Sequence, residues 1–298
     1  MKHFFVINPH SFARKGYKHI IDDINQSFAE SGEADYETYV SRYPRDAVAV
    51  VHDYINSVSA EETVRVYAVG GDGTFQARVN SVDLDKCVIQ YLPFGSGNNA
   101  YITFYNRPFD LERDILLAGT FKADLGQANG EYFITMFGLA LDAKVGRNLS
   151  KFRRFPISGK AKYYASIFYT LLFDTKPVNV RMTVDGVAED KVSSFISITN
   201  GPTTGGQTPI SPHSSAFDGK LNAIVAEKAS LFESVRLFSK IKTGEHLNDP
   251  GVSLYLFEEL VFESNDELMY EIEGEIRYAD RIEVKARKDA ITLKGKAI

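Results

Sequence analysis

The strongest constraint on the fold is a change in hydrophobic periodicity near residue 124. Before this point, apolar runs such as HFFVI, TVRVYAV and CVIQYLP alternate with helical patterns over residues 20–28 and 44–58. This order predicts a mostly parallel sheet covered by helices. After it, apolar and polar residues alternate in one run after another, from EYFITMFGLAL through VSLYLFEELVFE to RIEVKARK and AITLKGKA, which predicts antiparallel strands. Two helical patterns, residues 160–173 and 231–242, interrupt these strands.

A chain of 298 residues with this pattern is long enough for two domains. We expect residues 1–123 to form an α/β domain and residues 124–285 to form an antiparallel β domain. Residues from about 286 to 298 are expected to return to the first domain. Ligands of an open α/β sheet bind beyond the carboxyl ends of its strands, so we search for a site there.

Composition excludes several classes of protein. The chain carries 34 Lys and Arg against 39 Asp and Glu, and a net charge of −5 argues against binding nucleic acid through overall charge. Its single cysteine, Cys87, lies in an apolar run, so we expect a buried thiol and a reducing, cytoplasmic compartment. The most apolar segment, residues 163–173, is shorter than the ~18 to 20 residues of a spanning helix, so we expect no transmembrane segment.

The motif GGDGT, residues 70–74, follows an apolar strand and precedes a helical pattern. Glycines let the backbone approach phosphate oxygens closely and offer them its N–H groups. Asp72 would help to hold a metal–nucleotide complex, and Thr74 would donate a hydrogen bond to phosphate. The alternative is a tight turn that needs glycine only for its backbone angles. The position between strand and helix favours the phosphate site.

Two more small polar loops strengthen this prediction. LPFGSGNNA, residues 92–100, follows another strand, and INPHSF, residues 7–12, ends the first strand. Loops that follow different strands of a doubly wound sheet emerge at the same edge, so three such loops can converge on one nucleotide.

Together these motifs resemble a known family. NPHS, GGDGT and LPFGSGNN, followed in order by ADLGQANGEYF, TNGPTTGGQTPISPHSSAFDGKL and EIEGE, resemble the diacylglycerol kinase catalytic-domain family, which includes bacterial lipid kinases and the sphingosine kinases. GGDGT alone is shared with NAD kinases and related phosphofructokinases, and the later motifs favour the lipid kinases.

The resemblance implies a Rossmann-like, NAD-kinase-like α/β domain, a C-terminal antiparallel β-sandwich domain and an active-site cleft between them. Family members pass the γ-phosphate of ATP to a lipid hydroxyl, so ATP and Mg²⁺ are the implied cofactors and a lipid alcohol at a membrane surface is the implied partner. The implied nucleotide site comprises Asn8, Pro9, His10, Ser11, Phe12, Ser41, Gly70, Gly71, Asp72, Gly73, Thr74, Phe75, Gln76 and Ser96.

The resemblance also implies catalytic and metal-binding residues. Glu275, the last acid of EIEGE, resembles the family's general base, and Asp124 resembles the acid that positions metal and substrate beside it; Asp72 completes the implied catalytic set. The implied Mg²⁺ ligands are Ser215, Asp218 and the backbone carbonyl of Lys220. Without the resemblance, Glu275 is typical of a hairpin turn, Asp218 with Gly219 of an ordinary turn, and Asp124 of the start of a loop.

The sequence departs from the family pattern at several places. Gln76 and Ala77 stand where Asn-Glu is usual, Arg78 adds a cation, and Asn99 replaces an aspartate. Fewer carboxylates would weaken binding of Mg²⁺-ATP. Phe12 stands where glycine is usual, and its side chain would crowd the phosphates.

A basic segment lies in the second half of the chain. Residues 143–173 contain no acid and carry seven cations: Lys144, Arg147, Lys151, Arg153, Arg154, Lys160 and Lys162. Next to an apolar helix, they would dock on anionic headgroups, which predicts a cytoplasmic protein that binds the membrane peripherally. The alternative is a solvated basic loop followed by a core helix. The sequence leaves a homodimer open.

Three functions therefore compete. The leading hypothesis is an ATP-dependent kinase of a diacylglycerol-like lipid. A kinase of a soluble substrate, as in NAD kinases, shares the phosphate loop but not the later motifs. A nucleotide-binding protein with little catalysis is motivated by Phe12, Ala77 and Asn99.

Overall fold

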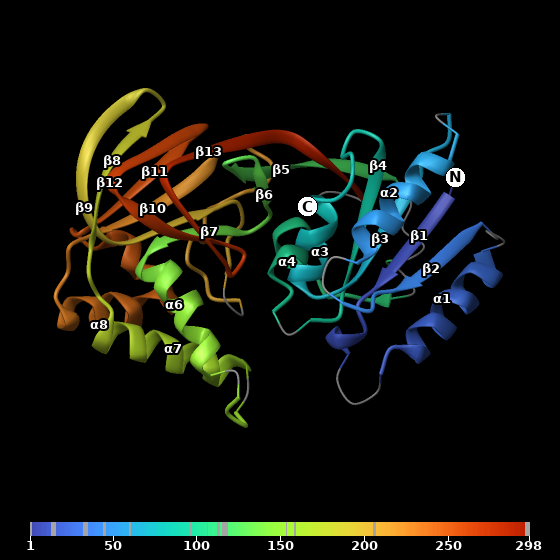
Figure 1. Ribbon diagram of the computed structural model, residues 1–298, viewed down its shortest axis with the longest axis horizontal. Coiled ribbons are helices and arrows are strands. Elements are labelled where there is room, and N and C mark those ends of the chain that lie inside the picture. Colours follow the sequence, from blue (N-terminus) through green and yellow to red (C-terminus); the bar gives the residue numbers. More distant parts are fainter. Residues whose placement is uncertain are drawn as a thin grey trace. The chain divides into compact units, whose positions relative to one another are not determined.

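The computed structural model describes residues 2–12, 16–31, 35–43, 46–59, 61–95, 97–105, 107–111, 114, 119–152, 154–157, 159–204 and 207–295, with backbone alone at 159 and 160 (Figure 1). The chain divides into two compact units, one of residues 1–123 with 289–298 and one of residues 124–288. The long strands β5 (Thr120–Ala128) and β13 (Glu275–Lys294) contribute residues to both units.

The first unit is a parallel α/β structure. Its strands are β1 (Lys2–Ile7), β2 (Tyr36–Val40), β3 (Val64–Gly70) and β4 (Cys87–Pro93), and its helices are α1 (Lys18–Ser31), α2 (Ala47–Ser57), α3 (Asp72–Val79) and α4 (Asn99–Tyr105). The strands pair in the order β2-β1-β3-β4, all parallel, and the end of β13 pairs with β4 through Leu293 and Ile89. The sequence predicts this parallel arrangement correctly.

Helices cover both faces of this sheet. On one face, Ile24 and Phe28 of α1 pack with Phe5 of β1, and on the other, Val51 of α2 packs with residues that include Cys87. Consecutive strand residues point to opposite faces, so strands covered on both faces are apolar throughout. Burial raises the pKa of the Cys87 thiol to about 11, which confirms a buried and unreactive thiol.

The second unit is built on antiparallel strands. These are β6 (Glu131–Phe133), β7 (Met136–Ala140), β8 (Val178–Val184), β9 (Val187–Thr199), β10 (Leu221–Glu227), β11 (Val252–Phe257), β12 (Glu259–Ile272) and most of β13. The pairing order is β11-β10-β9-β7-β12-β13, and β8 also pairs with both β9 and β12. The inner side chains of these strands, such as Phe137, Ile198 and Phe262, form one large core.

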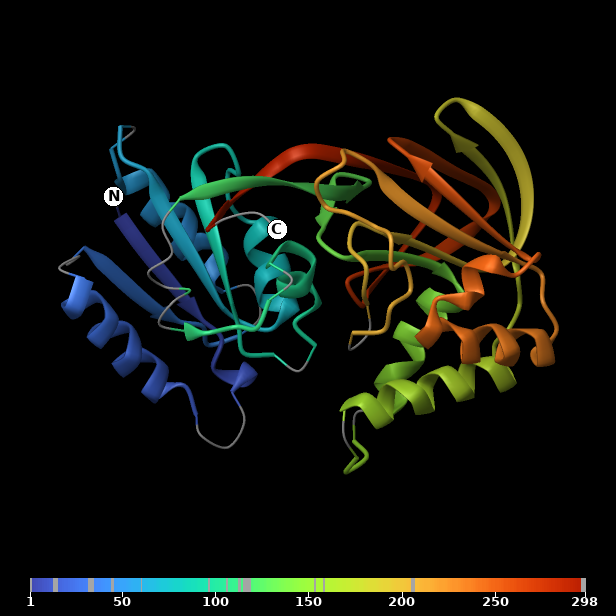
Figure 2. The ribbon, with the colours of Figure 1, turned by 180° about the vertical axis from the view of Figure 1, so that it is seen from behind.

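Three helices of the second unit lie against one face of these strands (Figures 1 and 2). They are α6 (Leu141–Leu149), α7 (Gly159–Phe173) and α8 (Leu231–Lys240). Val145 of α6 packs with Ile167 and Leu171 of α7. Ser230 begins α8 with a capping box, because its hydroxyl accepts from the backbone of Glu233, whose carboxylate accepts from Ser230. In the part of the chain that the structure describes, no helix is both long enough and apolar enough to cross a bilayer.

The structure corrects the sequence prediction at several elements. Helices α4 and α6 are absent from the prediction. Helix α4 has only seven residues, six of them buried, which is too short to show a helical period, and the run MFGLAL that leads into α6 is typical of a strand or of a helix. Strand β7 in fact ends at Ala140, whose φ of 61° turns the chain into α6. The predicted strand VSLYLFEELVFE is two strands that divide at Glu258, and RIEVKARK and the residues AITLK after it belong to the single strand β13.

Candidate active site

The loops at the carboxyl edge of the parallel sheet are hydrogen-bonded to one another. Nδ2 of Asn8, after β1, donates to Oγ1 of Thr74 at 2.9 Å. The backbone N–H of Gly71 donates to Oγ of Ser11 at 3.2 Å. After β2, Ser41 donates both its N–H, at 2.9 Å, and its hydroxyl, at 3.3 Å, to the carbonyl of Ile7. The loops after β1 and β3 therefore lie together, with the end of β2 beside β1.

Glycine is required where the loops after β3 and β4 meet. A Cβ atom at Gly95 would lie 2.5 Å from Cα of Gly71, and one at Gly70 would lie 2.5 Å from Oγ1 of Thr74. At Gly73, by contrast, a Cβ atom would meet nothing within 4 Å, so this backbone faces open space at the first turn of α3. A helix N-terminus with an unobstructed glycine backbone suits a phosphate group.

Asp72 ties two loops together. Its carboxylate accepts hydrogen bonds at 3.1 Å from the backbone N–H groups of Asn99 and Ala100, at the start of α4, and at 3.2 Å from the hydroxyl of Tyr91. Burial raises the pKa of Asp72, and these hydrogen bonds oppose the rise. The acid therefore holds the loop after β4 against GGDGT, and direct binding of metal by Asp72 stays a prediction.

The other predicted nucleotide residues lie in varied surroundings. Pro9 and His10 form a short 3-10 turn in which the N–H of His10 donates to Oδ1 of Asn8 at 3.1 Å. Phe75 is buried and stacks on Tyr91, so only its backbone is available to a ligand, and Gln76 is partly buried on α3. Ser96 lies outside the described residues.

Three residues that depart from the family pattern, Phe12, Asn99 and Arg78, pack within the first unit. The ring of Phe12 packs on Phe94, with centroids 4.9 Å apart, and belongs to the apolar cluster under α1. Asn99 is buried and contributes a backbone N–H to Asp72. Arg78 is buried as well, and burial lowers its pKa to about 10, with Asp46 opposing that shift.

In the second unit, Asp124 lies against the predicted metal-binding segment. Its Oδ2 accepts from the N–H of Gly219 at 2.6 Å, and its own N–H donates to the carbonyl of Ala216 at 2.8 Å. Within that segment, Oδ1 of Asp218 accepts from the N–H of Lys220 at 3.0 Å. The hydroxyl of Ser215 accepts from the N–H of Phe217 at 3.3 Å. The structure thus brings Asp124 together with residues 215–220.

Glu275 follows a two-residue hairpin turn between β12 and β13. Glu273, with φ of 49°, and Gly274, with φ of 84°, both have positive φ, as type I′ turns require, and Ile272 pairs with Glu275. Glu275 is more than half exposed, and its carboxylate accepts from Arg277 at 2.9 Å. That contact raises the pKa of the Arg277 guanidinium. Glu275 therefore sits at a defined and accessible position.

Glu273 fixes this turn to the rest of the unit. Its Oε1 accepts from the N–H groups of Ile134 at 2.9 Å, Thr135 at 2.5 Å and Met136 at 3.2 Å, and its Oε2 accepts from the Thr135 hydroxyl at 2.7 Å. The sequence prediction singled out Glu275 of the motif EIEGE and assigned no role to Glu273. The place of Glu273 directly before Gly274 in that motif is the sequence signal that would have found it.

A buried asparagine connects this turn with Asp124. Nδ2 of Asn200 donates to the carbonyl of Asp124 at 2.9 Å and to the carbonyl of Ile134 at 3.0 Å. The sequence prediction missed Asn200 as a site residue, although it ends a strand at TNG. Three segments that are far apart in sequence are therefore held in one network by Asn200 and Glu273.

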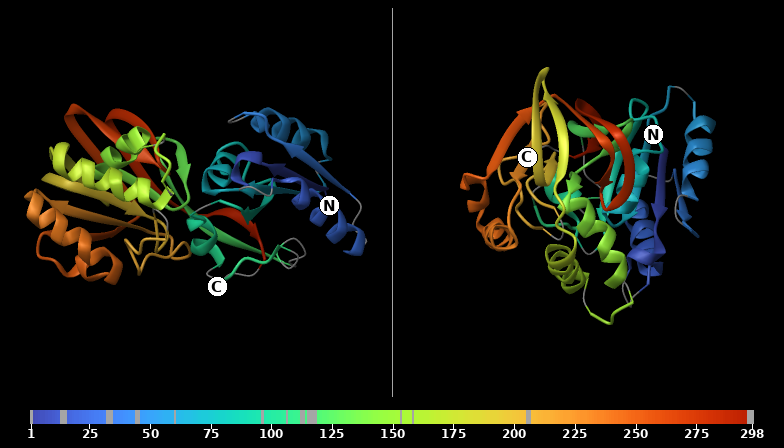
Figure 3. Two further views of the ribbon diagram at one scale, coloured as in Figure 1. Left: turned by 90° about the horizontal axis from the view of Figure 1, so that it is seen from below. Right: turned by 60° about the vertical axis from the view of Figure 1, so that its left-hand side comes forward.

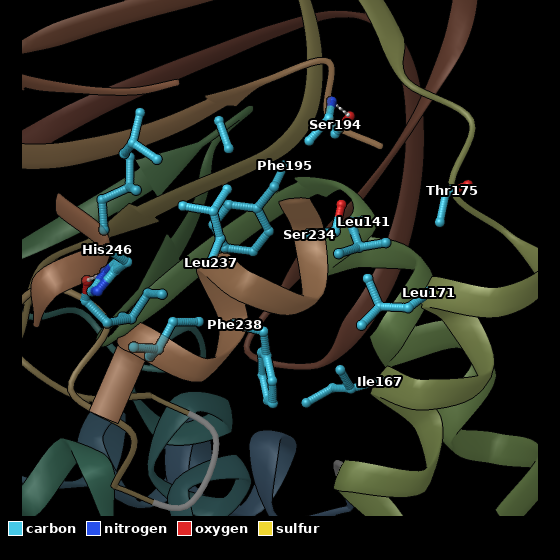
Figure 4. Close-up of a pocket in the computed structure, with 16 residues that line it drawn as sticks. Leu141, Ile167, Leu171, Thr175, Ser194, Phe195, Ser234, Leu237, Phe238 and His246 are labelled. Atoms are coloured by element: carbon cyan, nitrogen blue, oxygen red, sulfur yellow. Dashed lines mark hydrogen bonds between the residues drawn. The ribbon is translucent and has the colours of Figure 1, made fainter. Parts of the chain in front are cut away.

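The second unit also contains an apolar pocket of about 690 Å³, counting the space open to solvent. Figure 4 shows its walls, which include Ile167 and Leu171 of α7, Phe195 of β9, and Leu237 and Phe238 of α8. His246 is a polar exception in the wall, and burial lowers its pKa, so it is a neutral group near pH 7. The walls suit a hydrocarbon chain.

Two family models match the chain in succession. Residues 2–128 match the diacylglycerol kinase catalytic domain, and residues 136–293 match the YegS C-terminal NAD kinase β-sandwich-like domain. The chain belongs to the diacylglycerol kinase catalytic-domain family. This confirms the resemblance seen in the motifs, and it confirms the predicted class of an α/β structure followed by a β-sandwich-like structure.

Relatives of this lipid kinase family extend over most of the chain. The diacylglycerol kinase of Bacillus subtilis (strain 168) is 25% identical over 283 residues, which cover 91% of this chain and 88% of that protein. A solved structure from Bacillus anthracis str. Sterne matches 100% of this chain and 98% of its own with a TM-score of 0.79 at 17% identity. A second, described as a diacylglycerol kinase of the same organism, matches 99% and 97% with a TM-score of 0.67 at 15% identity. At these identities, the two structures show that this chain has the same fold as they have.

Proposed function

We propose that the chain is an ATP-dependent lipid kinase that transfers the γ-phosphate of ATP to the hydroxyl of a diacylglycerol-like lipid. The observation that carries this proposal is the set of loops after β1, β3 and β4, which hydrogen bonds and glycine contacts hold together around the open backbone at Gly73. Such a loop set is suited to nucleotide phosphates, and family membership supports a lipid as the acceptor.

In this proposal, Asn8 and Ser11 hold GGDGT in shape through Thr74 and Gly71, and Asp72 holds the loop after β4 beside it. A preformed loop is not reordered when the nucleotide binds, so its N–H groups need no further alignment. The side chains of Phe12 and Phe75 pack into the first unit, which keeps them away from the phosphates. Crowding by Phe12 is thus no reason to expect weak nucleotide binding.

Glu275 is the proposed general base. It accepts the proton of the lipid hydroxyl while the hydroxyl oxygen forms a bond to the γ-phosphorus and ADP leaves with the electrons of the broken P–O bond. Glu273 acts as a positioning residue, because its hydrogen bonds to residues 134–136 fix the turn that carries Glu275. Asn200 connects the same segment to Asp124.

The proposed Mg²⁺ ligands fit the metal in kind. Asp218 offers a carboxylate, Ser215 a hydroxyl and Lys220 a carbonyl, and Mg²⁺ prefers such hard oxygen ligands. The bond from Lys220 to Asp218 closes their segment into a compact turn, and Asp124 holds that turn through Gly219. Bound ATP would supply the phosphoryl group, and Mg²⁺ held by these residues would offset its negative charge.

The apolar pocket supports a lipid acceptor over a soluble one. Its walls are formed by apolar side chains of α7, α8, β9 and β10, whereas a dinucleotide or sugar would require several polar contacts. We propose that an acyl chain of the acceptor occupies this pocket, and that the protein meets its substrate at a membrane surface.

Phosphate transfer from labelled ATP to a panel of acceptors tests the proposal. With Mg²⁺, label should appear in dispersed diacylglycerol and not in NAD. Glu275→Gln should lower kcat at least 100-fold while ATP affinity is kept, because the amide cannot take the proton. Glu263→Gln is the matched control, since Glu263 is also an exposed acid of the second unit that pairs with an arginine, Arg281.

Each other result has a defined meaning. Transfer to NAD in place of lipid would establish a kinase of a soluble substrate. Absence of transfer to every acceptor, with ATP still bound, would establish a nucleotide-binding protein that lacks catalysis. A Glu275→Gln variant as active as the Glu263→Gln control would refute the assignment of the general base.

A further inference from the structure

Helix α7 has apolar side chains on both its inner and its outer face. Ile167 and Leu171 point inward and line the apolar pocket. Phe168 and Leu172, one helical turn apart, lie on the opposite face and are 61% and 56% exposed. A surface helix of a globular protein normally carries polar residues on its outer face, so this face is built for contact with something apolar.

The apolar surface extends beyond α7. Phe155 and Ile157, in the segment that leads into α7, are exposed. Helix α8 runs beside α7 in Figures 2 and 3, and Tyr164 of α7 contacts Phe238 of α8. Three further apolar side chains of α8 are exposed: Leu231, Phe232 and Val235. Large apolar groups on adjacent elements form a patch of the kind that marks an interaction site.

Only part of the basic segment contributes free positive charge. Lys144 and Arg147 both pair with Asp174, which offsets their charge, so they do not form the solvated basic loop that the sequence suggested. They lie on α6, which is helical. Arg153 and the side chain of Lys160 lie outside the described residues.

Two other cations of the segment, Lys151 and Arg154, lie beside the apolar patch. Nζ of Lys151 lies 4.1 Å from the centre of the Tyr169 ring, one residue after Phe168 on α7. Arg154 is exposed and immediately precedes Phe155. Residues 143–173 carry no acid in a chain whose net charge is −5. Among the described residues, no acid pairs with Lys151 or Arg154. Exposed aromatic and aliphatic groups next to such cations match the boundary between acyl chains and anionic headgroups.

We propose that the docking surface formed by Lys151, Arg154, Phe155, Ile157, Phe168 and Leu172 binds an anionic lipid bilayer. The cations contact the headgroups, and the apolar side chains enter the boundary of the acyl chains. The arrangement favours a bilayer over a second copy of this chain, because a copy would bring the same cations together. The inner face of α7 lines the pocket, so a docked α7 lies between the bilayer and the proposed acyl site.

This inference rests on the proposed lipid kinase function for its purpose, but its test does not depend on catalysis. The chain contains no tryptophan, so a single introduced tryptophan is a clean fluorescence reporter. In Phe168→Trp, vesicles of phosphatidylglycerol and phosphatidylcholine should shift the emission to the blue, and phosphatidylcholine alone should not. Leu254→Trp is the control, because Leu254 is a comparably exposed side chain on strand β11 and should show no shift.

Sedimentation with the same vesicles measures the affinity. The double variant Phe168→Glu with Leu172→Glu should bind at least tenfold more weakly than the original chain. Leu254→Glu with Leu256→Glu adds the same charge at two exposed leucines of β11 and should bind normally. Circular dichroism should show both variants folded, since all four side chains are exposed. Binding should weaken as salt is raised.

Three outcomes would overturn the docking surface: wild-type protein that stays in the supernatant, a Phe168 and Leu172 variant that sediments as well as its control, or a blue shift that depends on protein concentration without vesicles. The last would identify an interface between two copies. Activity toward a short-chain, water-soluble diacylglycerol separates the two proposals, because a docking variant should retain it and a chain that is not a lipid kinase never shows it.

Discussion

Ionisation of Asp142 should lower the stability of the second unit at neutral pH. Asp142 lies at the start of α6 and is 8% exposed, and a Cβ atom at Gly138 of β7 would lie 2.6 Å from its carboxylate. Glu271 of β12 pairs with Gly138, and a Cβ atom at Gly146 of α6 would lie 3.0 Å from its carboxylate. Two acids therefore face each other between helix and sheet, and each packs where only glycine leaves room.

Burial raises the pKa of Asp142 to about 7, and the Ser197 hydroxyl opposes this rise only in part. Burial, with Asp142 as the next cause, also raises the pKa of Glu271 well above its usual range. The folded chain thus keeps protons that the unfolded chain has already released. For Asp142 alone, the rise from 3.8 to about 7 corresponds to about 4 kcal/mol of stability.

The sign of the pH dependence follows from the raised pKa. This stability is fully present below pH 3.8, the unfolded pKa, and is lost as pH rises through about 7, the folded pKa. Asp142→Asn removes the titration and keeps the shape. Between pH 5 and pH 8, the variant should gain about 3 kcal/mol on the wild type in free energy of unfolding. Over most of that range the unfolded wild-type chain has released the proton of Asp142 and the folded chain keeps it, so each rise in pH favours unfolding until the pH passes about 7.

Guanidinium denaturation followed by circular dichroism at pH 5 and pH 8 measures this difference. Asp266→Asn, at an exposed acid in the same unit, should show the same difference from the wild type at both pH values. If the advantage of Asp142→Asn is equal at pH 5 and pH 8, Asp142 carries no raised pKa and the reasoning from burial is refuted.

Three further variants test the remaining geometry. Gly95→Ala should lower the free energy of unfolding by about 1–3 kcal/mol in denaturation, because its Cβ would lie 2.5 Å from Cα of Gly71. Gly73→Ala should keep the stability of the chain, since its Cβ would meet nothing within 4 Å, and should weaken ATP binding in calorimetry. Arg78→Met should leave the free energy of unfolding unchanged or raise it by about 1–3 kcal/mol, since methionine removes a buried cation and keeps most of the volume of the side chain. Glu273→Gln should cost about 1–3 kcal/mol in denaturation and lower kcat more than it raises KM, because both carboxylate oxygens accept hydrogen bonds and an amide N–H₂ in place of either one would face a donor.

The fold could be predicted where each element carries a distinct period. Strands β1, β3 and β4 are continuous apolar runs bounded by polar loops, which identifies buried parallel strands. Helix α6 could not be predicted, because MFGLAL is apolar through both the end of β7 and the start of the helix. The boundary depends on a positive φ at Ala140, which no residue type in that run signals.

The sequence likewise predicts some residues of the candidate site and not others. The loop residues could be predicted because glycine, asparagine and serine have few reasons to recur after successive strands except turns and ligands. Their partners could not be predicted. Asn200 donates to the backbone carbonyl of Asp124, and Thr135 donates its backbone N–H to Glu273, and neither residue stands out in its own segment. Contacts made by the main chain leave no pattern in residue types.

Asp124, Asp142, Glu271 and Glu273, four acids of the second unit, show why the position of an acid in a motif does not by itself assign its chemical role. Glu273 accepts hydrogen bonds from three backbone N–H groups and Asp124 from one, and such bonds favour the charged form of a carboxylate. Asp142 and Glu271 face each other, and burial favours their neutral forms, although the backbone N–H of Gly274 opposes this at Glu271. Glu271 lies near the end of β12 and Glu273 lies in the turn that follows, only two positions later, yet their surroundings give them opposite preferences. Replacement by glutamine should therefore be tolerated at Glu271 near pH 7, where it mimics the neutral acid, and should destabilise the chain at Glu273.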